Sequence, residues 1–195
     1  MDIYEAIHQR RSHRMYKPEI PPKEVLDRVI DAALWAPSGV NAQAWEITLM
    51  AGKVRDKFVE LVSQATKYLL PELQKAGVPE KGREFVMKFF KNLGGAPVVI
   101  AVTISKDPDP GMQMANIQSG AALFQNLLLA AHAEGLGTCW MTGPLKARAD
   151  EIAAFLGVPQ ELELVAIITL GYPDHQPPMP PKKDVARKTR WLGFD

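Results

Sequence analysis

The stretch MQMANIQSGAALFQNLLLAAHAE, from Met112 to Glu134, decides the fold of this chain. Its apolar residues recur every three and four positions, as on one face of a helix, and further leucines and alanines extend the apolar surface nearly all round it. Its glutamines and asparagines exclude a membrane span, because each would need a polar partner in hydrocarbon. We therefore expect a helix buried on several sides, partly by a second subunit.

Apolar patterning around this helix predicts the remaining elements. Helices are expected at about 2–9, 22–36, 53–64, 69–76, 80–92 and 145–156, and strands at 45–50, 97–104 and 161–172. The continuous β-branched run after Pro97 indicates a strand buried on both faces. Residues 138–143 fit either a loop or a short strand.

Composition favours a globular protein of one domain. The chain has 195 residues, of which 47% are hydrophobic and 23% charged, with a net charge of +1. This balance provides no general attraction for nucleic acid or an anionic membrane. Cys139 is the single cysteine, so no intrachain disulfide can form, and the first residues lack the pattern of a signal peptide. We expect a cytoplasmic location.

A basic cluster near the N-terminus predicts a phosphate site. Arg10, Arg11, Ser12 and Arg14 provide three guanidinium groups and a hydroxyl within five residues. Arginine matches phosphate oxygens through two parallel hydrogen bonds, and serine adds a neutral donor. A solvated basic turn is the alternative interpretation of the same residues.

Motifs for other chemistry are absent from the sequence. The chain contains no HExxH, CxxC, GxSxG or P-loop, and its four histidines show no metal-ligand spacing, so no metal site is predicted. Cys139 has no evident base nearby and fits a structural thiol better than a nucleophile. If the protein is an enzyme, a cofactor is expected to carry the reaction.

Five motifs occur in an order and spacing that resemble the nitroreductase family of FMN-dependent oxidoreductases. They are Arg10-Arg11-Ser12-x-Arg14, Ala36-Pro37-Ser38-Gly39-x-Asn41-x-Gln43-x-Trp45, Gly120-Ala121-Ala122 with Gln125–Ala131, Gly135–Trp140 and Leu170-Gly171-Tyr172-Pro173. The resemblance implies an α+β fold, with a central mixed or antiparallel sheet flanked by helices. It also implies an intertwined homodimer with two FMN sites at the subunit interface.

The resemblance assigns FMN-binding roles to the basic cluster and to a partner loop. Arg10 and Ser12 would hold the phosphate with help from Arg11, and Arg14 would lie near the pyrimidine edge of the flavin. The partner subunit would contribute Pro37, Ser38, Gly39 and Asn41.

Two further segments receive roles from the same resemblance. Trp140, Met141, Thr142 and Gly143 would pass along the flavin, and Lys182 and Lys183 would reach back to its phosphate. Thr142 and Ser119 stand where some members carry other polar residues, which leaves the recognition of the ring open.

Residues 66–92 match no shared motif and are expected to cover the site and set the substrate. Tyr68, Phe85, Phe89 and Phe90 are candidates to line the pocket, although phenylalanines at helical spacing also fit a plain core. Residues 173–195 are rich in proline, which excludes regular structure, and are expected to form an extended arm that ends in Trp191 and Phe194.

The function implied is an FMN-dependent NAD(P)H oxidoreductase that reduces nitroaromatics, quinones or similar acceptors by ping-pong kinetics. Reductive dehalogenation, with Lys67, Tyr68 and Glu72 over the substrate, is an alternative within the family. A flavin-binding module without catalysis is another. The sequence does not distinguish NADH from NADPH and does not identify the acceptor.

Overall fold

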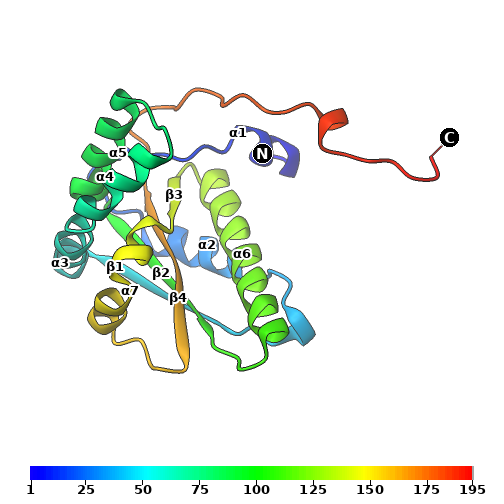
Figure 1. The fold of residues 1–195 in the computed structure, drawn as a ribbon, viewed down its shortest axis with the longest axis horizontal. Helices are drawn as coiled ribbons and strands as arrows, with labels where there is room; N and C mark the ends of the chain where they lie inside the picture. Colours follow the sequence, from blue (N-terminus) through cyan, green and yellow to red (C-terminus); the bar gives the residue numbers. More distant parts are fainter. Residues whose placement is uncertain (195) are drawn as a thin grey trace.

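A computed structural model describes residues 1–194, without the side chains of residues 146 and 147. Its centre is an antiparallel sheet of four strands in the order β1-β2-β4-β3 (Figure 1). The strands are β1 (Trp45–Ala51), β2 (Val98–Ser105), β3 (Gly137–Met141) and β4 (Leu162–Gly171). The α+β class and the flanked sheet are therefore confirmed, with purely antiparallel pairing. Residues 137–141 form a strand because they pair with the end of β4.

Helices cover both faces of the sheet and create two cores. On one face lie α2 (Lys23–Leu34) and α6 (Pro110–Ala133), and on the other lie α3 (Gly52–Ser63), α5 (Glu80–Asn92) and α7 (Gly143–Leu156). The two central strands, β2 and β4, are buried between these layers, which explains their continuous apolar sequences. Helix α4 (Thr66–Lys75) packs outside, on α5 and α7.

Local signals determine where several helices begin. Asp2 and Glu5 form a capping box at the start of α1 (Ile3–Gln9). Asp109 caps α6 by accepting a hydrogen bond from Met112 N, and Pro110 occupies the first turn, where its missing N–H costs nothing. The predicted 22–36 and 112–134 helices are thereby confirmed to within about two residues, the ordinary uncertainty of helix ends.

The structure corrects two expectations about proline. Helix α4 begins at Thr66 rather than 69 and contains Pro71 in its interior, where contacts with α5 and α7 hold the helix together. Residues 173–194 are extended as expected, except for one 3₁₀ turn, η3 (Val185–Arg187). That turn forms where the prolines have ended, and the Asp184 carboxylate accepts a hydrogen bond from Ala186 N.

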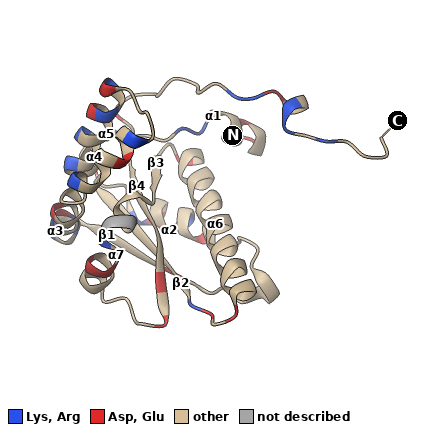
Figure 2. Cartoon of the chain, in the orientation of Figure 1, with Lys and Arg blue, Asp and Glu red and all other residues tan. Residues whose placement is uncertain are grey.

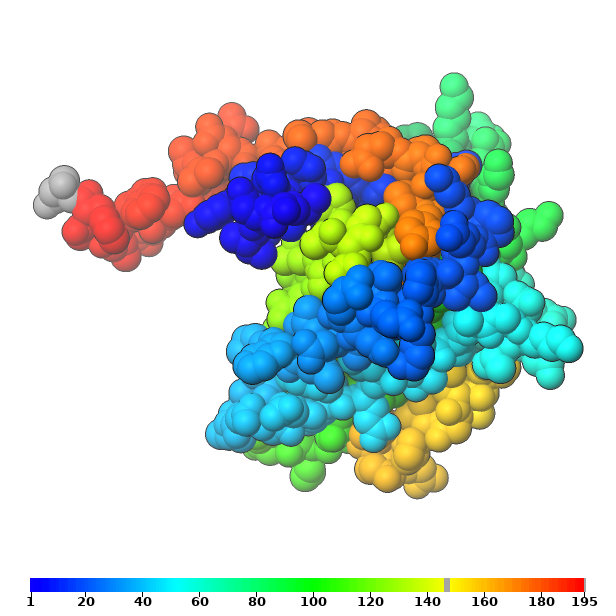
Figure 3. Space-filling model, turned by 180° about the vertical axis from the view of Figure 1, so that it is seen from behind, coloured from blue at the N-terminus to red at the C-terminus, as the bar shows by residue number. Residues whose placement is uncertain are grey.

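The C-terminal arm leaves the body of the molecule. It runs from β4 past α1 and projects beyond it (Figures 1 and 3). Trp191 and Phe194 stack edge to face with ring centroids 5.1 Å apart, and both are exposed within the single chain. Among residues 1–194, no helix is both long and apolar enough to traverse a bilayer.

Candidate functional site

The basic cluster lies on an extended segment at the outer edge of the sheet. Ser12 pairs in parallel with Thr138 of β3, and His13 N donates a hydrogen bond of 2.8 Å to Thr138 O. Tyr16 then pairs with Pro173, directly after β4. The cluster therefore rests on β3 rather than on a free turn, which opposes the alternative of a solvated basic turn.

The side chain of Tyr16 anchors this segment to β4. Its buried hydroxyl donates a 2.6 Å hydrogen bond to His13 O and lies 2.7 Å from Thr169 Oγ1 of β4. Burial raises the pKa of the phenol, so the hydroxyl keeps its proton. The backbone that carries Ser12 and Arg14 is thus held by side chains as well as by strand pairing.

The arginines of the cluster lack acidic partners. None of the ion pairs among the described residues includes Arg10, Arg11 or Arg14. Arg11 Nη1 instead donates to the carbonyls of His8 and Arg10, at 2.6 and 2.7 Å, while its buried Nε has no partner. Burial, and then repulsion from Arg11, lowers the pKa of Arg10. Among residues 1–194, the cluster is therefore a partly buried positive site that forms no ion pair with a carboxylate.

Two histidines lie beside this positive site, and His132 belongs to the last turn of α6. His13 is buried, and its Nδ1 lies 3.2 Å from His175 O. Burial is the main cause that lowers the pKa of His13 and of His132, and Arg10 contributes to both shifts. The Nε2 atom of His132 is buried without a partner. The unpaired Nε of Arg11 is a donor that suits a phosphorylated ligand, because an anionic oxygen would accept its hydrogen bond.

A cavity of about 250 Å³ opens beside Arg14. Its lining consists of Arg14, Met15, Tyr16, Phe85, Lys88, Phe89, Asn92, Gly94 and Asp174. The Arg14 guanidinium lies 6.0 Å from the centre of the Phe89 ring, and this contact directs its charge along α5. The cavity therefore combines aromatic walls with two cations, Arg14 and Lys88, and one carboxylate, Asp174.

Sequence reasoning found only part of this cavity. Phe85 and Phe89 line it, whereas Phe90 lies in the second core and Tyr68 is exposed on α4 beneath the Lys67 ammonium. Lys88 and Asn92 were missed. Their spacing of three and seven residues from Phe85 places them on the same side of a helix, and this signal could have found them.

The polar loop after α2 is rigid and strained. It contains η1 (Gly39–Asn41), and Gly39 N donates to Ser119 Oγ of α6 at 3.3 Å. Ser38 Oγ accepts a 3.0 Å hydrogen bond from Gln43 N, and Gln43 Nε2 donates to Asn41 Oδ1. Val40, Asn41 and Gln43 all have positive φ angles, which are uncommon outside glycine and concentrate at functional sites.

The polar loop and the basic cluster lie at different ends of α6 (Figure 1). The loop contacts the helix at Ala115 and Ser119, whereas the cluster lies beside His132. The helical rise separates Ser119 from His132 by about 20 Å. Within one chain, these two predicted parts of the site are therefore not brought together.

The remaining predicted residues occupy the end of β3 and the arm. Trp140 is partly exposed and meets Phe124 edge to face at 4.7 Å, while the Met141 side chain is buried. At Gly143 a Cβ would lie 3.1 Å from Leu69 Cδ2, so packing against α4 favours glycine there, independently of any cofactor. Thr142, Lys182 and Lys183 are exposed.

Comparison with known proteins agrees with this arrangement. A family profile described as the nitroreductase family matches residues 7–172. A protein of Methanothermobacter thermautotrophicus, named as an NADH dehydrogenase/NAD(P)H nitroreductase, is 32% identical over 91% of this chain and 80% of its own length. The iodotyrosine deiodinase of Thermotoga neapolitana is 28% identical over 94% of this chain and 95% of its own.

A solved structure supports both the fold and the cofactor class. It is a protein of Desulfovibrio desulfuricans described as a nitroreductase in complex with FMN, 25% identical, with a TM-score of 0.75 over 100% of this chain and 99% of that one. The predicted fold, and a relationship to FMN-dependent oxidoreductases, are thereby confirmed. This chain belongs to the nitroreductase family.

Proposed function

We propose that this protein is an FMN-dependent NAD(P)H oxidoreductase that reduces electron-poor acceptors such as nitroaromatics and quinones. The observation that carries the proposal is the basic cluster itself. Arg10, Arg11 and Arg14 are held on β3, are partly buried, and pair with no carboxylate among the described residues. Such an uncompensated site fits the phosphate of a flavin nucleotide.

The described residues suit the two ends of FMN differently. The phosphate would be bound by Arg10, Ser12 and the unpaired Nε of Arg11. The C-terminal arm would add Lys182 and Lys183. Arg14 and Lys88 line the cavity, where positive charge would favour the reduced, more anionic form of the ring. Trp140, Met141, Thr142 and Gly143 would offer backbone groups along the same ligand.

We further propose that the active protein is a homodimer formed through α6. The exposed side of this helix carries no charged residue (Figure 2) and includes Met114, Ile117, Gln118 and Gln125. A two-fold axis would pack α6 antiparallel to its copy. The polar loop of one subunit, with Pro37, Ser38, Gly39 and Asn41, would then approach the basic cluster of the other.

Bound FMN would supply the hydride chemistry, and the side chains would position it and its reactants. The aromatic wall of Phe85 and Phe89 excludes water from one side of the cavity, and Arg14 directs a positive charge toward it. We propose that residues 66–92, in the single domain of residues 1–195, cover the site. Donor and acceptor would occupy the same place in turn, which predicts ping-pong kinetics.

A reconstitution experiment tests the proposed function. The purified protein is incubated with FMN, desalted, and titrated anaerobically with NADH and with NADPH while the flavin absorbance at its visible maximum is followed. We expect retained flavin, bleaching by at least one nicotinamide, and parallel double-reciprocal plots with nitrobenzene as acceptor. A protein without flavin after desalting would refute the proposal, and retained flavin without turnover would support a binding module instead.

Reductive dehalogenation is a second candidate, favoured by the likeness to the deiodinase of Thermotoga neapolitana. Lys67, Tyr68 and Glu72 lie on the exposed side of α4, where they could contact a polar substrate. Release of iodide from iodotyrosine, measured beside nitrobenzene reduction under the same conditions, distinguishes the two. Iodide release that exceeds nitrobenzene reduction would favour the second candidate.

A further inference from the structure

Two buried nitrogen atoms without partners lie where α1 meets the last turn of α6. They are Nε of Arg11 and Nε2 of His132, and neither forms a hydrogen bond with any residue that the structure describes. A buried polar atom that has lost its bond to water normally has a partner in the protein, so each exception calls for an explanation. The proposed phosphate site accounts for Arg11 but not yet for His132.

The packing of α1 on α6 places His132 beside the basic cluster (Figure 1). Ala6 of α1 lines one groove together with Ala130 and Ala133 of α6. His132 lies between these two alanines in the chain. Arg10 follows one turn after Ala6, and its backbone N–H donates to Ala6 O at 3.0 Å. The ends of α1 and α6 therefore converge at the basic cluster within a single chain.

The groups that face His132 are basic. Burial, followed by repulsion from Arg10 and Arg11, lowers the pKa of its imidazole. His13 is a third basic neighbour, since His132 contributes, after burial, to the lowering of the His13 pKa. These neighbours disfavour a charged His132, so its ring is neutral near pH 7.

Nearby acids do not offset this positive charge. Glu134 is only two residues from His132, but its carboxylate accepts hydrogen bonds of 2.9 and 2.6 Å from Arg28 of α2. In the described part of the chain, none of the ion pairs includes His132. An anionic ligand at the basic cluster would therefore change the charge around this ring.

We propose that His132 takes up a proton from solvent when FMN binds, and donates a hydrogen bond from Nε2 to the phosphate. The inference rests on the proposed function, in which Arg10 and Ser12 hold the same phosphate. A phosphate monoester carries a charge of about −1.5 to −2 at pH 7, which would offset the arginine charges that keep His132 neutral. The imidazolium then supplies a charged hydrogen bond, which is shorter and stronger than a neutral one. FMN binding thereby becomes tighter as pH falls toward 7.

Proton uptake, measured by isothermal titration calorimetry, tests this assignment. FMN is titrated into the flavin-free protein at pH 7.2, in PIPES and in Tris, and the difference between the two binding heats gives the number of protons exchanged. The phosphate has a second pKa of about 6, so it is already ionised at this pH. We expect net uptake in the wild type and its loss in His132→Gln. His8→Gln is the matched control, because the His8 ring is exposed on α1 and only its carbonyl bonds Arg11.

The affinity for FMN provides a second readout in the same titrations. His132→Gln is expected to weaken binding at least about tenfold, the usual contribution of a hydrogen bond between charged groups. Between pH 7.2 and 8.2 the wild-type dissociation constant should rise, whereas that of His132→Gln should stay constant, because only the wild type couples binding to this proton. His8→Gln should follow the wild type.

Thermal unfolding without FMN checks that the variant is folded. The Nε2 atom of His132 has no partner to lose, so at pH 7.5 His132→Gln is expected to unfold at the wild-type temperature. If the variant does not fold, the wild-type titration still decides, because proton uptake is required of the wild type itself.

Three outcomes would overturn the inference and leave the proposed function standing. They are FMN binding by the wild type without proton uptake, uptake that persists in His132→Gln, and an equal loss of uptake in His8→Gln. By contrast, a wild-type protein that binds no FMN would overturn the proposed function itself.

Discussion

At the scale of single residues, Arg10 offers the most direct test of the proposed phosphate site. Its guanidinium is partly buried beside a second arginine and has no carboxylate partner among the described residues. Arg10→Gln should weaken FMN binding at least about tenfold, because a charged hydrogen bond contributes roughly 1.5–3 kcal/mol. Isothermal titration calorimetry with FMN measures the change. Arg28→Gln is the control, since Arg28 is exposed and bonded to Glu134, and equal losses in both variants would contradict the assignment.

Tyr16 links stability to the site through its hydroxyl. Tyr16→Phe leaves His13 O without its 2.6 Å donor and removes the contact with Thr169. The free energy of unfolding should fall by about 1–3 kcal/mol, the cost of leaving a buried polar group unsatisfied. Urea denaturation followed by circular dichroism measures it. A loss near zero would show that water replaces the hydroxyl without cost.

At the scale of elements, the turn η2 (Leu93–Gly95) positions the basic segment. Tyr16 N donates to Gly94 O, and a Cβ on Gly94 would lie only 2.2 Å from Arg14 O. Gly77 also has a positive φ but has open space around it, so the two glycines form a matched pair.

Alanine substitutions at these two glycines distinguish the cost of a left-handed backbone from the cost of a steric clash with Arg14. Gly77→Ala should cost about 1–2 kcal/mol from its left-handed backbone alone. Gly94→Ala should cost about 1–3 kcal/mol more, because Arg14 must move to accommodate the methyl group. Chemical denaturation gives both values, and only Gly94→Ala should also weaken FMN binding. Equal costs would show that η2 tolerates the displacement.

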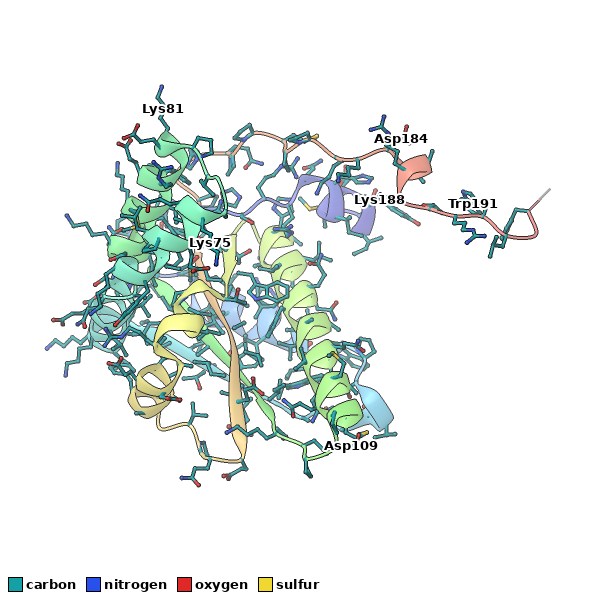
Figure 4. All side chains as sticks on the ribbon, in the orientation of Figure 1. Lys75, Lys81, Asp109, Asp184, Lys188 and Trp191 are labelled. Carbon is teal, nitrogen blue, oxygen red and sulfur yellow. The ribbon has the colours of Figure 1, made fainter. Side chains whose placement is uncertain are left out.

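At the scale of the whole molecule, the proposed dimer would give the arm a partner surface. Its aromatic residues are exposed, and Trp191 lies far from Asp109 at the N-terminal end of α6 (Figure 4). Replacing both Trp191 and Phe194 with alanine should raise the dimer dissociation constant at least about tenfold, because buried aromatic anchors dominate interfaces. Sedimentation velocity over a range of concentrations measures it, with Val54→Ala, at an exposed valine of α3, as the control. A wild-type protein that is monomeric at all concentrations would contradict the proposed dimer.

The charge states of His13 and His132 predict a pH dependence of stability. Burial lowers the pKa of His13 and His132 below the ordinary value of 6.5, so the unfolded chain binds more protons than the folded one as pH falls below 6.5. The free energy of unfolding should therefore be highest above this pH and should decline below it. Thermal unfolding at pH 7.5 and 5.5 should show a smaller decline in His132→Gln than in the wild type. The exposed His8→Gln variant should behave as the wild type does.

Patterns within short stretches were sufficient for most of the elements. The spacing of apolar residues from Met112 to Glu134 predicts α6, and the β-branched run after Pro97 predicts β2, because each pattern reports burial directly. Local patterns leave residues 138–143 open between loop and strand, and they place the start of α4 at 69 instead of Thr66. Pairing with β4 and packing on α5 decide these two features. These contacts join residues far apart in the chain.

The candidate site likewise has features that neighbouring residues determine and features that only the fold determines. The amino-acid sequence by itself determined that residues 10–14 carry a concentrated positive charge and that residues 37–43 form a polar bend, because both follow from neighbouring side chains. Only the tertiary structure decided that Lys88 and Asn92 join Arg14 around one cavity, and that bend and charge lie at different ends of α6. The reason is physical: helical spacing can place Lys88 and Asn92 on one side of α5, but strand pairing and helix packing set the distances between separate segments, and no local pattern encodes those distances.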